Sequence, residues 1–238
     1  MLLDILTSGG GIQSALISLL LTLPIMMLAL SAHETAHGYV AYKCGDPTAY
    51  NLGRLTLNPI KHLDPVGLGC LLLFGFGWAK PVPINTRSFR NPKRGMALSA
   101  LAGPMANLIL GVICAALYGA VMAIYVDKLM LAYATQASAY SLNLLQYLAV
   151  ALQFGAYINF LYMAFNLIPV PPFDGSRIAL IFLPTNLYFK IMRYERQIMY
   201  GVLIALFVLS YIGYSPFTWI YTSLTNLIAE PIFNAILS

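Results

Sequence analysis

The chain has 238 residues, of which 60% are hydrophobic and 9% are charged. Soluble domains carry about 25% charged residues, so this composition excludes an ordinary soluble domain. The glycines, prolines and three cysteines follow no period or pairing pattern that would indicate a fibre or a disulfide-stapled module. The net charge of +5 is interpreted as a topology signal rather than as affinity for nucleic acid. We therefore expect an all-α polytopic membrane protein, with one integral-membrane domain over residues 1–238.

The first apolar segment, residues 12–42, is long enough to cross a bilayer, which takes a helix of about 20 residues. Asp4 precedes it and no Lys or Arg does, so the basic start of a cleavable signal peptide is missing. We therefore expect this segment to be retained as the first membrane span.

Near the end of that span stands the sequence His-Glu-Thr-Ala-His, at positions 33–37. On a helix, His33 and His37 lie one above the other, so both imidazoles can face one metal ion with Glu34 beside it. Zinc accepts His nitrogens and a carboxylate and leaves a fourth position for water. Ionisable groups inside an apolar helix are costly and mark function. We therefore expect one Zn²⁺ per chain at this motif.

The connection over residues 43–95 is rich in Gly, Pro and Asn, and it contains short runs such as NLGRLTLN and GLGCLLLFGFGWA. The second run is too short and too interrupted by glycine to span a bilayer as a helix. We predict a membrane-associated segment of β-strands or a re-entrant segment, which requires its backbone to be paired or buried in protein.

The second span, residues 96–126, carries small residues at every fourth position. This spacing predicts close approach of a neighbouring helix. Asn107 is the one amide in the set and could have a further role. The set is Ser99, Gly103, Asn107, Gly111, Ala115, Gly119 and Ala123.

Three further apolar segments follow, at residues 138–168, 198–214 and 216–236. Gly213 and Pro216 mark either a loop between the last two or a kink within one helix. The sequence therefore predicts about five to six transmembrane helices, with residues 198–238 forming the C-terminal ones.

Basic residues are distributed unevenly among the connections. Twelve of the thirteen fall in the first and third connections, which the positive-inside rule places in the cytosol, with the amino terminus outside. We therefore predict a multi-pass protein of the cell membrane whose metal site faces the cytosolic side. The residues are Lys43, Arg54, Lys61, Lys80, Arg87, Arg90, Lys93 and Arg94, then Lys128 alone in the second connection, then Arg177, Lys190, Arg193 and Arg196.

A catalytic zinc ion takes three protein ligands, so a third must come from outside the HExxH motif. The candidates are His62, Asp64, Asp174 and Cys44. Asp174 is favoured, because it closes a proline-rich run that ends the third span on the side predicted for His33 and His37. The three cysteines form no CxxC pair, and a thiolate metal site is not indicated.

Three motifs together resemble those of the site-2 proteases, which are intramembrane zinc metalloproteases. They are HETAH, the AGPMAN run at 102–107 and NLIPVPPFDG at 166–175, and they cover a catalytic core of about residues 25–180. The NPIKHLDPVG stretch is similar to the compact bacterial branch. The resemblance implies zinc bound by His33, His37 and Asp174, with Glu34 in catalysis. No segment is long and polar enough to be a PDZ or CBS domain.

The function predicted from this resemblance is hydrolysis of peptide bonds within or near transmembrane segments of membrane proteins. Zinc would activate water, and Glu34 would act as general base. Asn107 and Asn166 are candidates for oxyanion stabilisation or substrate binding, with a hydrogen bond between helices as the alternative for each. Residues 43–95 could receive an unwound substrate as an added strand.

Two other functions use the same metal site: a metal or proton transporter, and an inactive scaffold that binds membrane proteins. The clustering of polar residues near one membrane face disfavours transport, and the intact Glu34 disfavours the scaffold. Expected partners are a single-span membrane substrate and the lipid bilayer, without nucleic acid. Regulation by a second copy of the chain or by a separate membrane protein is left open.

Overall fold

The computed structural model describes residues 11–74, 79–135 and 140–212. Every element named in these residues is helical, and the one β-pairing among them is an isolated antiparallel bridge between Leu63 and Ala79. The elements are α2 (Gly11–Lys43), α3 (Thr48–Asn51), η1 (Pro59–His62), α4 (Pro65–Phe74), η2 (Thr86–Ser88), α5 (Pro92–Thr135), α6 (Tyr140–Asn166), α7 (Asp174–Ala179), η3 (Leu180–Phe182), α8 (Thr185–Arg193) and α9 (Glu195–Tyr211).

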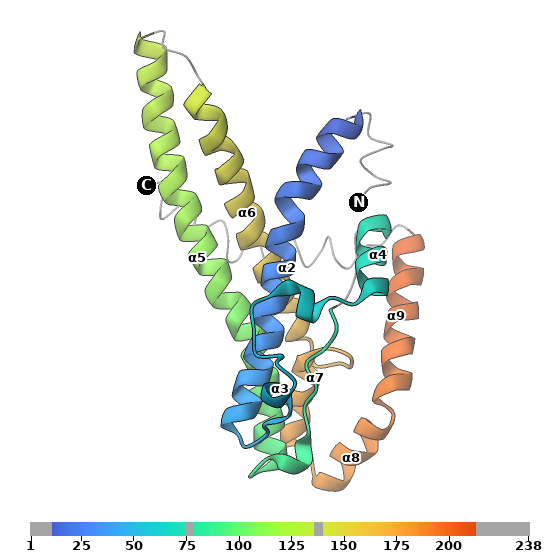
Figure 1. The fold of residues 1–238 in the computed structure, drawn as a ribbon. Helices are drawn as coiled ribbons and strands as arrows, with labels where there is room; N and C mark the ends of the chain where they lie inside the picture. The colour runs from blue at the N-terminus through green and yellow to red at the C-terminus, as the bar shows by residue number, and fades with distance from the viewer. Residues whose placement is uncertain (1–10, 75–78, 136–139, 213–238) are drawn as a thin grey trace.

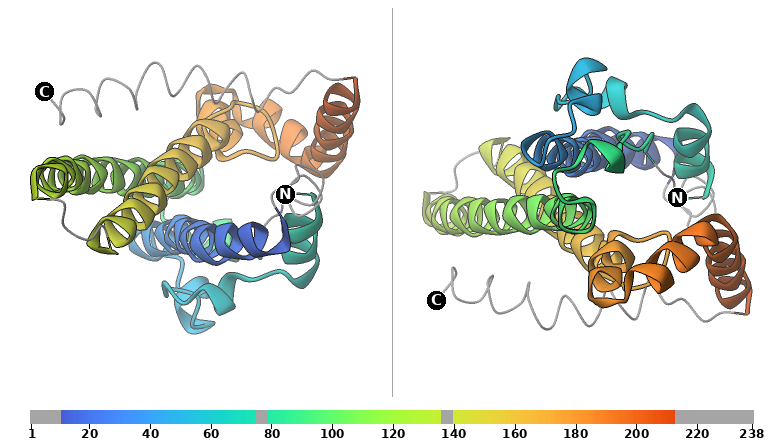
Figure 2. Two further views of the ribbon diagram at one scale, coloured as in Figure 1. Left: turned by 90° about the horizontal axis from the view of Figure 1, so that it is seen from above. Right: turned by 90° about the horizontal axis from the view of Figure 1, so that it is seen from below.

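Three long helices, α2, α5 and α6, form the framework of the protein (Figure 1). Helix α5 has 44 residues and is therefore about 66 Å long at 1.5 Å per residue. It packs against both α6 and α2. In Figure 1 the three helices lie together in their lower half, and α2 diverges from the other two towards the top; the views along the vertical axis show the same divergence (Figure 2).

The stripe of small residues on α5 is a packing surface, as its spacing predicts. Gly111 lies so close to Phe160 of α6 that a Cβ atom there would come within 2.8 Å of the ring. Ala115 is fully buried in a cluster with Ala156 and Phe160. The stripe is buried as far as Gly119, and Ala123 is exposed, so it ends where α5 extends beyond its neighbours.

Two of the described helices are long and apolar enough to cross a membrane, α5 over Pro92–Leu131 and α6 over Leu144–Asn166. Helix α9 has 17 residues, about 26 Å, and is shorter than a bilayer core of about 30 Å. The segment expected at 216–236 lies outside the described residues. The total of five to six spans therefore stays a prediction.

The connection between α2 and α5 differs from the strands expected there. Residues 65–74 form helix α4, so the strand interpretation of this stretch is wrong. The reason is local: the Asp64 carboxylate accepts hydrogen bonds from the main-chain N–H groups of Val66 and Gly67, and Pro65 occupies the first helical position. The stabilisation of the helix start by this cap outweighs the lower helix propensity of the glycines that follow. Whether the segment is re-entrant stays a prediction.

Candidate metal centre

Helix α2 presents His33 and His37 on one face, one turn apart. Their rings meet edge to face with centroids 4.5 Å apart, and their Nε2 atoms lie 2.9 Å from each other. Both side chains are buried, at 5% and 7% exposure. The helical spacing alone produces this pair, as the HExxH pattern predicts.

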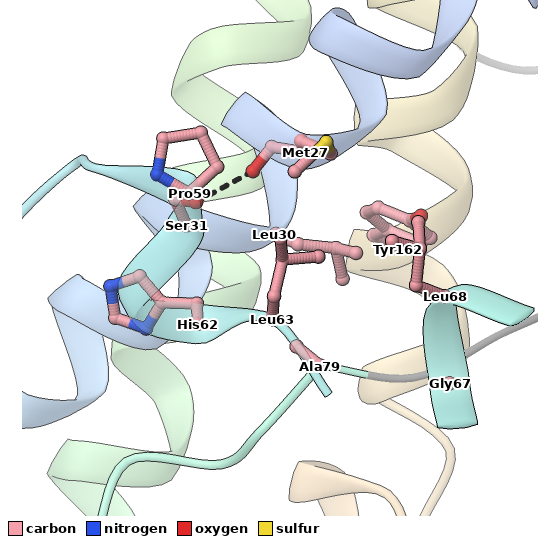
Figure 3. A pocket seen from close by; sticks show the side chains of 10 residues that line it. All are labelled: Met27, Leu30, Ser31, Pro59, His62, Leu63, Gly67, Leu68, Ala79 and Tyr162. Atoms are coloured by element: carbon pink, nitrogen blue, oxygen red, sulfur yellow. Dashed lines mark hydrogen bonds between the residues drawn. The ribbon is translucent and has the colours of Figure 1, made fainter. Parts of the chain in front are cut away.

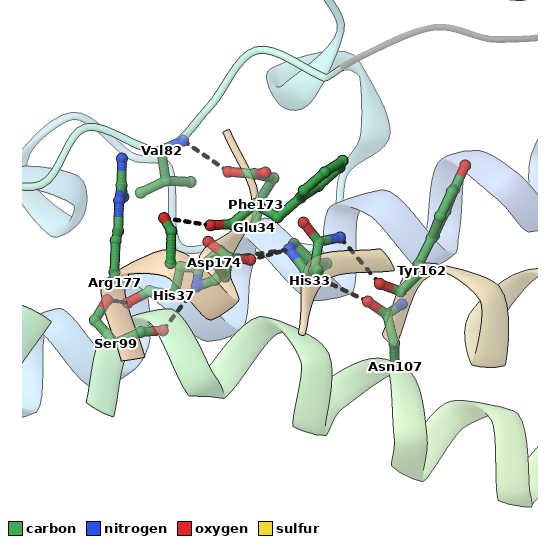
Figure 4. A network of polar contacts seen from close by, with 12 residues as sticks. His33, Glu34, His37, Val82, Ser99, Asn107, Tyr162, Phe173, Asp174 and Arg177 are labelled. Carbon is green, nitrogen blue, oxygen red and sulfur yellow. Dashed lines mark hydrogen bonds and ion pairs between the residues drawn. The ribbon is translucent and has the colours of Figure 1, made fainter. Parts of the chain in front are cut away.

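Asp174 completes the cluster from the start of α7. Its Oδ2 atom lies 3.1 Å from Nε2 of His33 and 3.1 Å from Nε2 of His37. Helix α6 ends at Asn166, and the proline-rich turn that follows precedes Asp174, which lies beside both histidines (Figure 4). Among the described residues, these three form a group whose ligand atoms all lie within 4.8 Å of one another.

The other nitrogen of each imidazole is hydrogen-bonded to an oxygen that can only accept. Nδ1 of His33 donates to Oδ1 of Asn107 at 2.5 Å, and Nδ1 of His37 donates to the main-chain oxygen of Ser99 at 2.7 Å. Both protons are therefore on Nδ1 in the neutral rings, and the Nε2 lone pairs face Asp174. Metal-binding histidines are usually oriented in this way. The donor set of two imidazoles and one carboxylate suits zinc.

Asn107 is fully buried, and its amide orientation is fixed by three contacts. Its Nδ2 donates to the oxygen of Ala29 at 3.3 Å and to Oδ1 of Asn159 at 2.8 Å, while its Oδ1 faces His33. Asn159, on α6, donates in turn to the oxygen of Gly155. Asn159 is not among the residues predicted from the sequence, although an amide within an apolar span is a signal that could have identified it.

Gly103 provides the space for the two imidazoles. A Cβ atom at this position would lie 2.5 Å from Nε2 of His37 and 2.6 Å from Cε1 of His33. Helix α5 can therefore approach the histidines only because residue 103 has no side chain. The small-residue stripe thus makes room for the His-His-Asp group as well as for helix packing.

The electrostatic state of Asp174 reflects two opposing effects. Burial raises the pKa of its carboxyl group, but when the imidazoles of His33 and His37 carry a second proton on Nε2, their hydrogen bonds and charge outweigh burial and hold the pKa well below its usual range. The carboxylate is therefore ionised at neutral pH, as a metal ligand must be.

Glu34 lies beside the cluster and is partly exposed. Its Oε2 atom accepts a hydrogen bond of 2.8 Å from the main-chain N–H of Val82 (Figure 4). Val82 lies in the connection between α4 and α5, in a stretch without regular secondary structure, so Glu34 is contacted from this connection. Nothing in the sequence indicated this main-chain contact.

The remaining candidate ligands lie elsewhere. His62 is buried beside a cavity of about 30 Å³ between α2, η1, α4 and α6 (Figure 3), and its Nε2 donates to the oxygen of Thr56 at 2.8 Å. Asp64 caps α4, and Cys44 packs against the cluster formed by Ala41, Phe89 and Met96. The structure thus brings Asp174 to the histidines and leaves the other three candidates outside the group.

Asn166, the second candidate amide, ends α6 and is partly buried. One of its two N–H groups donates to the oxygen of Tyr162 on the same helix, at 3.0 Å. Its predicted part in oxyanion or substrate binding stays a prediction.

Two candidate membrane spans and a buried His-His-Asp cluster beside a glutamate are the features expected of a membrane metalloenzyme. Residues 21–210 match peptidase family M50. The chain is 41% identical over 182 residues, 76% of each chain, to "Putative zinc metalloprotease YwhC" of Bacillus subtilis. It is 34% identical over 92 residues to "Putative zinc metalloprotease Rip2" of Mycolicibacterium smegmatis, which covers 37% of this chain and 35% of that protein. No solved structure matches the chain significantly.

The chain therefore belongs to peptidase family M50, the site-2 protease family that its motifs resemble. Its enzyme class is that of the family, a metalloprotease.

Proposed function

We propose that the protein is an intramembrane zinc protease that hydrolyses peptide bonds within or near the transmembrane segments of membrane proteins. The convergence of His33, His37 and Asp174 next to Glu34 carries this proposal. The names of the two relatives, both zinc metalloproteases, support zinc as the metal.

His33, His37 and Asp174 would hold the zinc ion through Nε2, Nε2 and Oδ2. Bound there, zinc supplies Lewis acidity to a peptide carbonyl and to a water molecule. Glu34 would act as general base towards the attacking water through its carboxylate and would return that proton to the leaving amine as general acid. Its partial exposure is consistent with this role, since a fully enclosed carboxylate could not reach water or substrate.

We assign oxyanion stabilisation to Asn166 rather than to Asn107. Both N–H groups of Asn107 are directed to protein acceptors, so its contribution is to orient His33. Asn166 directs one N–H to Tyr162, and the other is the donor that we assign to the developing oxyanion.

The substrate is expected to be a single-span membrane protein, and the active site is expected to face the cytosol. The basic residues of the first and third connections support this orientation. A regulatory partner, either a second copy or a separate membrane protein, remains part of the proposal.

The test is cleavage of a single-span membrane peptide by the purified full chain in liposomes, with and without a zinc chelator. We expect zinc-dependent cleavage that Glu34→Gln abolishes while bound zinc stays at one per chain, because the amide cannot accept the proton. Asp127→Asn, the same change at an exposed position far along α5, is the matched control and should cleave normally. Cleavage by Glu34→Gln would contradict the proposal.

The same liposomes distinguish the transporter alternative. Loading them with a zinc-sensitive dye measures flux across the bilayer. Flux without cleavage would favour transport, whereas cleavage without flux supports the protease.

A further inference from the structure

Residues 80–85 have no regular secondary structure and pass beside Glu34, and the prolines at 81 and 83 favour an extended conformation for Lys80 and Val82. The centre of this segment is Pro81-Val82-Pro83, and the two prolines have no N–H group. The N–H of Val82 is therefore the only main-chain donor of this tripeptide, and it is directed to Oε2 of Glu34 at 2.8 Å. A carboxylate accepting a main-chain N–H is held in a defined orientation.

Contacts from the preceding loop fix this segment from the other side. Arg54, 9% exposed, donates through Nη2 to the oxygen of Lys80 at 2.7 Å and to that of Pro81 at 3.3 Å. The N–H of Lys80 donates to the oxygen of His62 at 2.8 Å, next to the bridge between Leu63 and Ala79. The two residues before Val82 are thus held by three hydrogen bonds.

The Val82 side chain is itself packed onto α2. It is 7% exposed, and a Cβ atom added at Gly38 would lie 3.0 Å from its Cγ1. Gly38 is one turn beyond Glu34 on the same helix. The segment is therefore held against α2 by its side chain as well as by its N–H.

We propose that Val82 is the positioning residue of Glu34, and that Arg54 acts through it by fixing the segment. This inference rests on the proposed function, in which Glu34 is the general base. With Oε2 held by Val82, the carboxylate loses rotational freedom before the reaction, and its second oxygen is left to take the proton. Held in this way, the base is oriented before substrate binds.

The same contacts argue that this part of the connection does not receive a substrate strand. In residues 80–83 every main-chain N–H is either absent or already donated, and the oxygens of Lys80 and Pro81 accept from Arg54. An added strand pairs through both donors and acceptors. Residues 80–83 therefore serve Glu34 rather than substrate pairing.

Two substitutions at one position test the proposal. Val82→Pro removes the N–H but keeps three side-chain carbons, and a residue before proline already favours the extended conformation that proline adopts. Val82→Ala shortens the side chain and keeps the N–H. We expect kcat of the Pro variant to fall about 10- to 100-fold below that of the Ala variant, as for loss of a charged hydrogen bond. KM and bound zinc should differ less than about twofold between the two variants.

Equal kcat values for the two variants would overturn the proposal, and so would a change confined to KM, which would assign the segment to substrate binding. If Val82→Pro does not retain zinc, Arg54→Met and Arg54→Lys replace it. We then expect kcat to fall with Met and to recover in part with Lys, which keeps a cationic donor; kcat unchanged by Met would overturn the proposal. Glu34→Gln distinguishes failure of the proposed function from failure of this inference. If Glu34→Gln still cleaves, the proposed function fails. If it is inactive and the two Val82 variants have equal kcat values, only this inference fails.

Discussion

His33 donates its Nδ1–H to Oδ1 of Asn107 at 2.5 Å, a contact that joins α2 to α5 across 74 positions of the sequence. His37 makes the corresponding contact with a main-chain oxygen, that of Ser99. The orientation of one imidazole therefore depends on a side chain that can be replaced, whereas that of the other depends on the backbone.

Replacing Asn107 by alanine should weaken zinc binding by about 10- to 100-fold, the usual cost of losing a group that orients a metal-binding histidine. The change removes the acceptor for His33 and also leaves Oδ1 of Asn159 without its donor from Asn107. Competition for zinc against a chelator of known affinity would measure the loss.

Ser99→Ala is the control for this experiment. The Ser99 hydroxyl donates to the oxygen of His37, but the oxygen that His37 contacts belongs to the backbone and survives the substitution. Zinc affinity should therefore change by less than about threefold, in line with the modest worth of one neutral hydrogen bond. Equal losses in the two variants would show that side-chain orientation of His33 is not what Asn107 supplies.

Gly103→Ala should abolish stoichiometric zinc binding. The added Cβ would lie about 2.5 Å from both imidazoles, so either ring or helix must move. Overpacking of this kind costs typically about 1–3 kcal/mol. Zinc content after dialysis and the midpoint of thermal unfolding would report the two effects.

Gly201→Ala on α9 is the matched substitution, because a Cβ there meets no atom within 4 Å. Alanine is favoured over glycine in a helix by up to about 1 kcal/mol, so this variant should be as stable as the original or slightly more so. If Gly103→Ala retained zinc as Gly201→Ala does, close approach of α5 would not be required for the site.

Gly175→Ala should displace Asp174 from the histidines. A Cβ at residue 175 would overlap the main-chain carbonyl of Leu167, and a backbone group cannot rotate away as a side chain can. We expect destabilisation of about 1–3 kcal/mol and loss of the carboxylate ligand. Cobalt substitution would reveal this, since the visible spectrum of bound Co²⁺ changes with its ligand set; an unchanged spectrum would contradict the expectation.

In the metal-free protein, Asp174 should stabilise the fold in a pH-dependent way. Its pKa is lowered in the folded state, so its contribution is complete above the ordinary carboxyl pKa of about 3.9 and is lost as pH falls towards the lower folded value. The stability difference between the original chain and Asp174→Asn should therefore shrink below about pH 4. Thermal unfolding in chelator at pH 6, 5, 4 and 3 would test this, and a constant difference would argue against it.

The pairing of His33 and His37 was predictable from the sequence, because helical spacing is local, whereas Asp174 lies 141 positions from His33 and was favoured because the proline-rich run that it closes ends the third span on their side. Helical spacing places His33 and His37 on one face, and the prolines after Asn166 end α6 just before Asp174. The helix at residues 65–74 was not predicted, because its glycines indicated an interrupted segment, whereas the cap formed by Asp64 stabilises a helix there.

The sequence by itself therefore indicated the class of protein through its composition, the histidine pair through helical spacing, and the family and the third candidate ligand through motifs that resemble those of known proteases. Only the tertiary structure decided which atoms orient them. The contacts of Glu34 with Val82, His37 with Ser99 and His33 with Asn107 join positions 48, 62 and 74 residues apart. Two of the three use main-chain atoms, which every residue possesses. Such contacts therefore cannot be predicted from the pattern of side chains in the sequence.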